Sequence, residues 1–248
     1  MTDWNSVFDG ILTERQFKVN EPMNRHNTYG IGGPADVFVM PQTEDQLKQV
    51  LRRADELHIP VTVIGGGSNS LISDRGIRGI TLCTARMKSS TVRKGNQIIV
   101  TGGAGTGAVS RFAMKEGLSG LEFAAGIPGT LLGAVFMNAN GYGSKFANVV
   151  HSVRTVTRDG RQEKHYTLEE IQYGDSDSVF MHNGDIVLEV VFDLKEGNPE
   201  EIKAVVDEYQ ASRRAKQPLE KRSAGTMFLR PPGRYVGPMI KGCDLMGF

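Results

Sequence analysis

The chain has 248 residues, of which 39% are hydrophobic and 23% charged, and its formal net charge is +1. This near-neutral charge excludes a global attraction to nucleic acid or to an anionic membrane, so any anion must be bound by a local site. The sequence has no apolar run of membrane-spanning length, no signal-peptide pattern and no metal or disulfide spacing around its two cysteines. We therefore expect a cytoplasmic protein without a nucleic-acid or membrane partner.

The hydrophobic pattern predicts strands and helices in alternation. Thr43 and Gln46 can form a capping box at the start of one helix, and Asn198 followed by Pro199 starts another. Asp159-Gly160 is typical of a hairpin turn. The predicted strands lie at 36–40, 61–67, 79–82, 96–103 and 185–194, the hairpin at 151–167, and the helices at 43–60, 106–117 and 198–218.

Glycine is enriched, with 30 residues that gather in clusters, which indicates tight turns and close backbone approach. Gly65–Gly67 end a predicted buried strand, where ligands of strand–helix–strand units bind. Their free N–H groups can form an anion-binding nest, to which Ser68 and Asn69 can add side-chain donors. A tight structural turn is the alternative. A triphosphate-binding loop is excluded, because no Gly-Lys-Ser/Thr follows.

The dinucleotide fingerprint Gly-x-Gly-x-x-Gly/Ala occurs twice. At 30–35 it neither follows a strand nor opens a helix. At 103–108 it does both, and Glu122 lies about 20 residues further on, although not at the end of a second strand. An NAD-dependent Rossmann enzyme therefore stays open as an alternative, beside a glycine-lined turn that packs against a neighbour.

A second glycine-rich segment, residues 120–143, is mostly small or apolar. Its glycines allow the backbone to lie flat against a large planar group, and its asparagines can supply polar contacts. A buried, tightly packed turn explains the same pattern equally well. The residues concerned are Gly126, Gly129, Gly133, Asn138 and Asn140.

Four segments together resemble one enzyme family, the UDP-N-acetylenolpyruvoylglucosamine reductases, also called UDP-N-acetylmuramate dehydrogenases. The resemblance extends from about residue 20 to the end, and the short stretch between 144 and 196 is similar to the shorter class common in Gram-positive bacteria. The segments are NTYGIGGPAD (27–36), VIGGGSNSLISDRG (63–76), GLEFAAGIPGTLLGAVFMNANGYG (120–143) and SAGTMFLRPPG (223–233).

The resemblance implies an α+β protein. FAD would lie between two subdomains of the vanillyl-alcohol-oxidase (PCMH) type, and an incomplete α+β C-terminal domain would bind substrate. The expected divisions are an N-terminal segment 1–22, subdomains 23–100 and 101–196, and a substrate domain 197–248. The resemblance also implies a C-terminal truncation, because the family continues further and its essential glutamate finds no match here. We expect a monomer.

The resemblance also implies site residues. The FAD pyrophosphate would be held by Gly65, Gly66, Gly67, Ser68 and Asn69. The flavin would be lined by Gly126, Ile127, Pro128, Gly129, Gly133 and Asn138. The UDP-sugar would be contacted by Arg213, Arg214, Lys216 and Arg230, although a solvated helix C-terminus explains the first three as well. No metal is expected.

The implied reaction is the NADPH-linked reduction of UDP-N-acetylglucosamine enolpyruvate to UDP-N-acetylmuramate for peptidoglycan synthesis and the cell wall, hence for cell shape and division. Thr226 takes the place of the family's serine proton donor. Gly174 occupies the place of an arginine, and Asp175 and Asp177 nearby would repel a developing enolate. These departures predict weak turnover. The alternative is a catalytically inactive FAD- or nucleotide-binding homologue.

Overall fold

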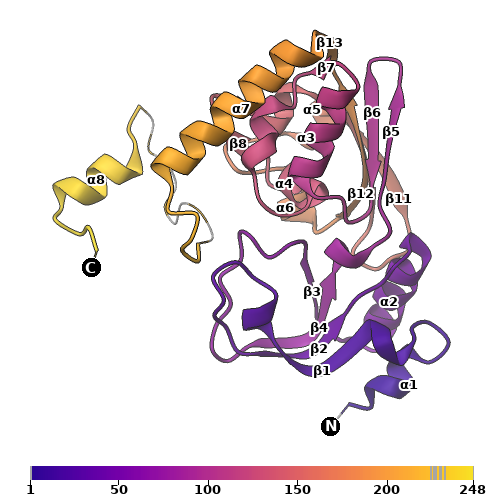
Figure 1. The fold of residues 1–248 in the computed structure, drawn as a ribbon. Helices are drawn as coiled ribbons and strands as arrows, with labels where there is room; N and C mark the ends of the chain where they lie inside the picture. Colours follow the sequence, from indigo (N-terminus) through magenta and orange to yellow (C-terminus); the bar gives the residue numbers. More distant parts are fainter. Residues whose placement is uncertain (1, 224, 226–227, 229–230, 232, 248) are drawn as a thin grey trace.

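The protein is described here from a computed structural model, which defines residues 2–223, 225, 228, 231 and 233–247. Two lobes, each built on one β-sheet, lie one above the other in Figure 1, with the N-terminus at the lower lobe and the last helix beside the upper one. No helix within the described residues is both long and apolar enough to cross a membrane.

The lower lobe contains a four-stranded sheet in the order β1-β2-β4-β3, in which only the β1–β2 pair is antiparallel. Helix α2 lies between β2 and β3 in the chain, as the strand–helix–strand prediction required. The elements are α1 (Trp4–Phe8), η1 (Glu14–Gln16), β1 (Phe17–Pro22), η2 (Met23–Arg25), β2 (Pro34–Val39), α2 (Glu44–Glu56), β3 (Val61–Ile64), β4 (Ile77–Cys83) and η3 (Thr84–Arg86).

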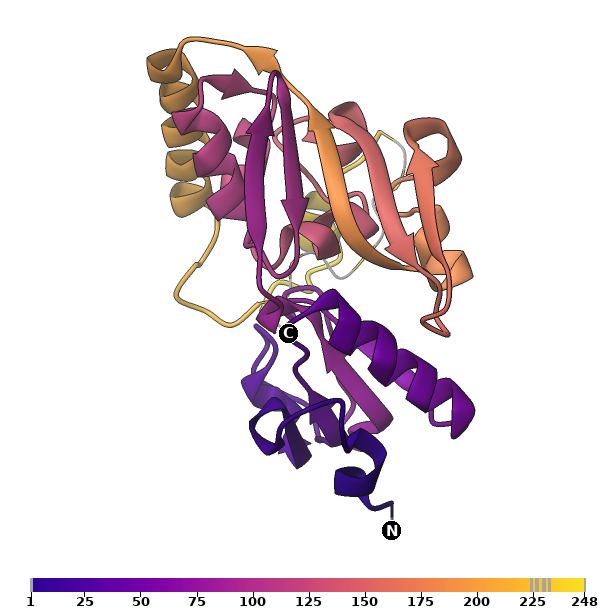
Figure 2. The same ribbon diagram turned by 90° about the vertical axis from the view of Figure 1, so that its right-hand side faces the viewer.

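The upper lobe contains an antiparallel five-stranded sheet in the order β11-β10-β12-β6-β5, with helices packed against one face (Figure 2). Its strands are β5 (Ser90–Lys94), β6 (Gln97–Thr101), β10 (Val150–Val156), β11 (Glu163–Thr167) and β12 (Ile186–Asp193). Its helices are α3 (Thr106–Lys115), η4 (Glu122–Gly126), α4 (Leu131–Phe136), η5 (Phe146–Asn148), α5 (Leu168–Ile171), α6 (Val179–Asn183) and α7 (Pro199–Lys216). Two short pairs are β7 (Leu118–Ser119) with β13 (Lys195–Glu196), and β8 (Asn140–Gly141) with β9 (Ser144–Lys145).

Local sequence signals explain where the long helices begin. Thr43 Oγ1 accepts a hydrogen bond from Gln46 N at 3.2 Å, which caps α2. The predicted capping box forms only by half, because the Gln46 side chain accepts from Gln42 N at 2.9 Å instead. The cap of α7 is confirmed, since Asn198 Oδ1 accepts from the N–H of Glu200 at 2.9 Å.

One hydrophobic cluster crosses from the lower sheet to the upper one. Leu47 and Leu51 of α2 and Leu82 of β4 pack with Val156 of β10 and Leu188 of β12. All five side chains are at most 1% exposed. The two lobes therefore share a core on this side of the molecule, which fixes how their opposite edges face each other.

The strand pairing differs from the expected domain boundaries. β1, inside the expected segment 1–22, pairs with β2 of the lower sheet. β5 lies inside the expected subdomain 23–100 and β6 crosses its end, yet β5 pairs with β6, and β6 pairs with β12 of the upper sheet. We propose a division between η3 and β5, because hydrogen-bonded strands belong to one sheet.

The expected substrate domain begins with α7, which packs on the upper lobe. Ile202 and Val206 are buried on its inner face, and the helix contacts η4 and α3. The next described helix, α8 (Val236–Gly242), buries none of its residues and lies apart from both lobes in Figure 1.

Candidate functional site

The two glycine-rich segments meet between the lobes. The loop after β3 lies against the turn before α4, and a Cβ added to Gly66 would stand 2.9 Å from Gly129 Cα. Ser68 Oγ donates a hydrogen bond to the Pro128 carbonyl at 3.1 Å. Gly67 has φ +67°, and a Cβ there would overlap the carbonyl oxygen of His26. Side chains at Gly66 and Gly67 would therefore push the segments apart.

The main-chain donors of this loop are free to bind an anion. Within the described part of the chain, none of the N–H groups of residues 65–69 donates a hydrogen bond to a protein acceptor. The left-handed conformation of Gly67 turns successive N–H groups as in an anion-binding nest. The main chain of Gly65, Gly66, Gly67, Ser68 and Asn69 thus fits the pyrophosphate of a dinucleotide. The side chains of Ser68 and Asn69 donate within the protein instead, to Pro128 O and to Met137 Sδ.

Thr130 is a site residue that the sequence reasoning missed. Its hydroxyl is buried without a hydrogen-bond partner among the described residues. The hydroxyl faces Gly65, where a Cβ would overlap it, and Gly133, where a Cβ would lie 2.9 Å away. The sequence signal that could have identified Thr130 as a candidate site residue is its position directly after Gly129.

The other predicted flavin-lining residues have different surroundings. A Cβ on Gly126 would lie 3.2 Å from Arg213 Cδ of α7, and Ile127 packs partly against the core of the upper lobe. Asn138 is 1% exposed; its Nδ2 donates to Gly174 O at 2.8 Å and its Oδ1 accepts from Ala147 N at 3.0 Å. These contacts favour a structural role for Asn138, and its contact with a flavin stays a prediction.

The second fingerprint, residues 103–108, supports the Gly129 turn. Thr106 N and Thr106 Oγ1 both donate to the Gly129 carbonyl, at 3.1 and 3.2 Å, and Leu131 N donates to Ala104 O at 2.8 Å. The preceding strand β6 lies in an antiparallel sheet, whereas a Rossmann fingerprint follows a parallel strand. The glycine-lined turn is therefore confirmed over the NAD-dependent Rossmann alternative.

A cavity of about 350 Å³ opens beside the nest on the lower lobe. His26 forms one wall of the cavity, and two contacts hold its side chain in place. Its ring stacks on that of Phe38 with centroids 4.0 Å apart, and its Nε2 lies 2.8 Å from Glu21 Oε1. Burial raises the pKa of the Cys83 thiol, which keeps it neutral on another wall. The lining includes Arg25, His26, Gly65, Gly66, Cys83 and Arg86.

Helix α7 reaches the glycine segment through two tyrosines. The rings of Tyr142 and Tyr209 stack with centroids 4.1 Å apart and planes 4° apart, and Tyr142 Oη donates to Tyr209 O at 2.6 Å. Of the predicted substrate residues, Arg213 thereby lies next to Gly126, with its Nε bonded to Gln217 Oε1 at 2.9 Å.

The remaining predicted substrate residues are less constrained. Arg214 and Lys216 point from the exposed end of α7. Thr226, the predicted proton donor, and Arg230 lie outside the described residues. Their roles stay predictions.

The loop with Gly174 is tied to α4. Tyr173 Oη donates to Val135 O at 3.1 Å, and Gly174 N donates to Asp177 O at 3.0 Å. Asp177 Oδ2 lies 2.9 Å from His182 Nε2, and this hydrogen bond holds the pKa of Asp177 below its usual range. The carboxylate of Asp177 is therefore engaged by His182 on the protein surface.

This geometry, an anion-binding loop on one α+β lobe facing a glycine-rich turn on the other, defines a flavoprotein of the two-lobed FAD-binding class. A family model described as an FAD binding domain matches residues 35–165. An alkyldihydroxyacetonephosphate synthase, 14% identical over 79% of this chain and 41% of its own, has the same fold with a TM-score of 0.58. The fold class predicted from the sequence is thus confirmed.

Similar proteins narrow this class to one family. The UDP-N-acetylenolpyruvoylglucosamine reductase of Geobacillus thermodenitrificans is 44% identical over 96% of this chain and 77% of its own length. That of Clostridioides difficile is 40% identical over 96% and 78%. The crystal structure of the Thermus caldophilus reductase superposes with a TM-score of 0.78, at 31% identity over 94% and 81%. The chain belongs to the UDP-N-acetylenolpyruvoylglucosamine reductase family, as the four sequence motifs predicted.

Proposed function

We propose that this protein reduces UDP-N-acetylglucosamine enolpyruvate to UDP-N-acetylmuramate, with FAD as cofactor and NADPH as reductant, in peptidoglycan precursor synthesis. It is an FAD-dependent oxidoreductase by family. The observation that carries the proposal is the unpaired N–H loop after β3, which closes on the Gly129 turn of the other lobe. This pairing would place an anion site next to the glycine-rich turn of the opposite lobe.

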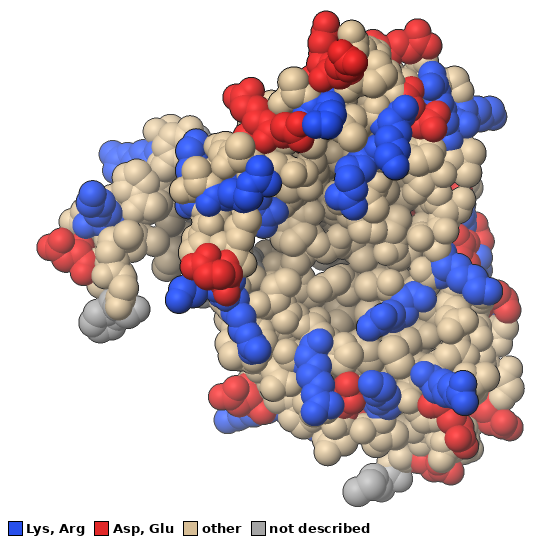
Figure 3. Space-filling model, in the orientation of Figure 1, with Lys and Arg blue, Asp and Glu red and all other residues tan. Residues whose placement is uncertain are grey.

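The main chain performs the cofactor binding in this proposal. Residues 65–69 would hold the pyrophosphate with N–H groups, and residues 126–129 with Gly133 would support the flavin. FAD held there would supply the hydride-transfer chemistry that links NADPH to the substrate. The surface is hollowed between the two lobes on the face shown in Figure 3, which leaves access for the two substrates in turn.

The protein must also stabilise and protonate the substrate enolate that follows hydride transfer. We assign substrate anchoring to Arg213 of α7, because its side chain lies against Gly126, and to Arg214 and Lys216 in the same last turn of the helix. Arg230 and the proton donor Thr226 complete the proposed set. Gly174 offers no cation at the expected arginine position, so enolate stabilisation would be weaker than with an arginine.

The cellular setting follows from the chemistry. We infer a cytoplasmic location, supported by the free thiols of Cys83 and Cys243, which suit a reducing compartment. A monomer stays our prediction for the oligomeric state.

The test is product formation by the FAD-reconstituted protein. UDP-N-acetylmuramate, detected by mass spectrometry, should form only when NADPH and the enolpyruvyl sugar nucleotide are both present. Without an arginine at Gly174 we expect turnover well below about 10 per second, an ordinary enzyme rate. Tight FAD binding without any product would contradict the proposal and favour the inactive homologue.

A further inference from the structure

We propose that a second cavity, at the β7–β13 end of the upper lobe, binds a small zwitterion with an apolar side chain, of the class of the aliphatic α-amino acids. The cavity has a volume of about 310 Å³ and lies between α7, η4 and the β7–β13 pair, which stands at the top of Figure 1. It shares no lining residue with the cavity beside Gly65 and Gly66, so this site goes beyond the proposed function and does not depend on it.

Two groups of opposite charge, Glu122 and Lys195, are left free in this cavity. Glu122 Oε2 accepts a hydrogen bond from Gly120 N at 2.8 Å, and neither charged side chain has an ion-pair partner in the part of the chain that the structure describes. The third charged lining residue, Asp193, is already engaged, because its Oδ2 lies 2.7 Å from His151 Nδ1. One free carboxylate and one free ammonium match a ligand that carries both charges itself.

The strand pairing places these two charges on the same side of the cavity. Lys195 of β13 pairs directly with Ser119 of β7, and both residues line the cavity. Residues paired in this way have Cβ atoms about 4.5–5.5 Å apart. The next residue after Ser119, Gly120, holds the Glu122 carboxylate. The two charged groups form no ion pair with each other, so an amino acid can place its ammonium on Glu122 and its carboxylate on Lys195.

The floor of the cavity is apolar and suits an aliphatic side chain. Phe123 is 2% and Leu194 6% exposed, and Val205 of α7 stands in the wall. A Cβ added to Gly120 would lie 3.0 Å from Leu194 Cδ2 and 3.3 Å from Val149 Cγ1, so the bare backbone of Gly120 lies close against these side chains. A volume of about 310 Å³ is at the lower end of the range for ligand pockets, about 300 to 1,000 Å³, which suits a single amino acid.

The experiment compares L-leucine with its two singly charged analogues on the full chain, by ligand-observed NMR titration. 3-Methylbutylamine keeps the ammonium and the branched side chain, whereas 4-methylpentanoate keeps the carboxylate and the branched side chain. Leucine should bind saturably at one molecule per chain. Each analogue should bind about tenfold more weakly, because it lacks one charge-assisted hydrogen bond.

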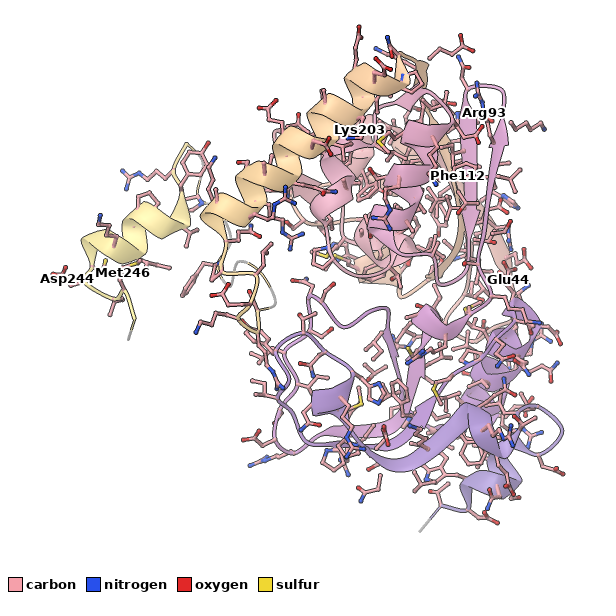
Figure 4. All side chains as sticks on the ribbon, in the orientation of Figure 1. Glu44, Arg93, Phe112, Lys203, Asp244 and Met246 are labelled. Carbon is pink, nitrogen blue, oxygen red and sulfur yellow. The ribbon has the colours of Figure 1, made fainter. Side chains whose placement is uncertain are left out.

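Two variants assign the two charges of the ligand to the two residues. Glu122→Gln keeps an oxygen for Gly120 N, and it should weaken leucine and the amine about tenfold but leave 4-methylpentanoate unchanged. Lys195→Gln should weaken leucine and 4-methylpentanoate about tenfold but leave the amine unchanged. Lys203→Gln is the matched control and should change none of the three constants, because Lys203 of α7 (Figure 4) pairs with Asp207 and does not line the cavity.

The comparison of leucine with its analogues needs no variant, so it tests the site even if a variant fails to fold. No saturable binding of leucine to the wild type at millimolar concentration would overturn the inference, and so would equal binding of leucine and both analogues. Leucine affinities that are the same in the wild type, Glu122→Gln and Lys195→Gln would overturn it as well. None of these measurements uses FAD or NADPH, so their failure is distinguishable from a failure of the proposed function.

Discussion

Two threonines flank the same turn with opposite hydrogen bonding. Thr106 donates to the Gly129 carbonyl, whereas the Thr130 hydroxyl is buried without a partner in the described chain. An unsatisfied buried hydroxyl destabilises the fold, whereas a satisfied one stabilises it. Thr130→Val should therefore raise the free energy of unfolding of the flavin-free protein by about 1 kcal/mol, and Thr106→Val should lower it by about the same amount.

Urea denaturation of the flavin-free protein measures both threonine variants. Both variants remove the hydroxyl of a buried threonine. The difference between their effects on stability therefore reports the hydrogen bond that Thr106 makes and Thr130 lacks. A Thr130→Val protein less stable than the wild type would show that the hydroxyl has a partner.

At the residue scale, the sequence predicted that these positions require glycine, but it did not predict which residues the glycines contact. Gly66 and Gly67 were recognised as backbone that must remain bare, which the contacts with Gly129 and His26 confirm. Their partners lie about 60 and 40 residues away in the chain, so no local pattern could identify them. For the same reason the internal contacts of Asn138 were not foreseen.

A cluster of charges joins α2 of the lower lobe to the β10–β11 hairpin of the upper lobe, near Glu44 in Figure 4. Arg154 Nη1 and Nη2 each lie 2.9 Å from a Glu44 oxygen, and Nη1 lies 3.1 Å from Glu163. The Arg154 side chain is only 16% exposed. Hydrogen bonding to Glu44 raises the pKa of Arg154, so its charge is permanent.

Arg154→Met should lower the free energy of unfolding by about 2 kcal/mol at pH 7, because it leaves partly buried carboxylates without their cation. Arg161→Met is the control, since Arg161 pairs with Asp55 but is 46% exposed, and it should lower the free energy of unfolding much less than Arg154→Met does. Urea midpoints at constant m-value provide the comparison. If the two variants lowered the free energy of unfolding equally, the partly buried ion pair of Arg154 with Glu44 would not be stabilising the contact between the lobes.

The stabilisation that Arg154 provides should depend on pH, and the direction of this dependence follows from the pKa of Glu163. Hydrogen bonds, first from Lys48 and then from Arg154, hold the pKa of Glu163 below its ordinary 4.5. The stabilisation is therefore complete above pH 4.5 and is lost as the pH falls through the lower folded-state pKa. The difference between wild type and Arg154→Met should shrink in acid.

Elements with local signals were predicted closely, whereas their pairing was not. Thr43, Asn198 and Pro199 marked the starts of α2 and α7, because caps act within one turn. Strand β6 was predicted at 96–103 but assigned largely to the first subdomain, whereas its pairing partner β12 is about 90 residues away, and β5 was not predicted as a strand. Pairing over such distances depends on the whole core.

At the scale of the molecule, the shared core and the glycine contact lie on two different sides of the junction between lobes. The cluster around Leu47 and Val156 fixes the lobes relative to each other, and the loops at Gly66 and Gly129 are thereby held face to face. The sequence supplied this architecture through the four-motif resemblance only. Composition and periodicity alone left a Rossmann enzyme open.

In the proposed complex the N–H groups of residues 65–69 hold one FAD, and the turn at Gly129 on the other lobe supports it. The most direct test follows the amide resonances of the isotope-labelled protein during an FAD titration. Resonances of residues 65–69 and of Gly129 and Thr130 should shift together and saturate at one FAD per chain, whereas those of distant Gly95 should not move. Saturable FAD binding that leaves residues 65–69 unshifted would contradict the account.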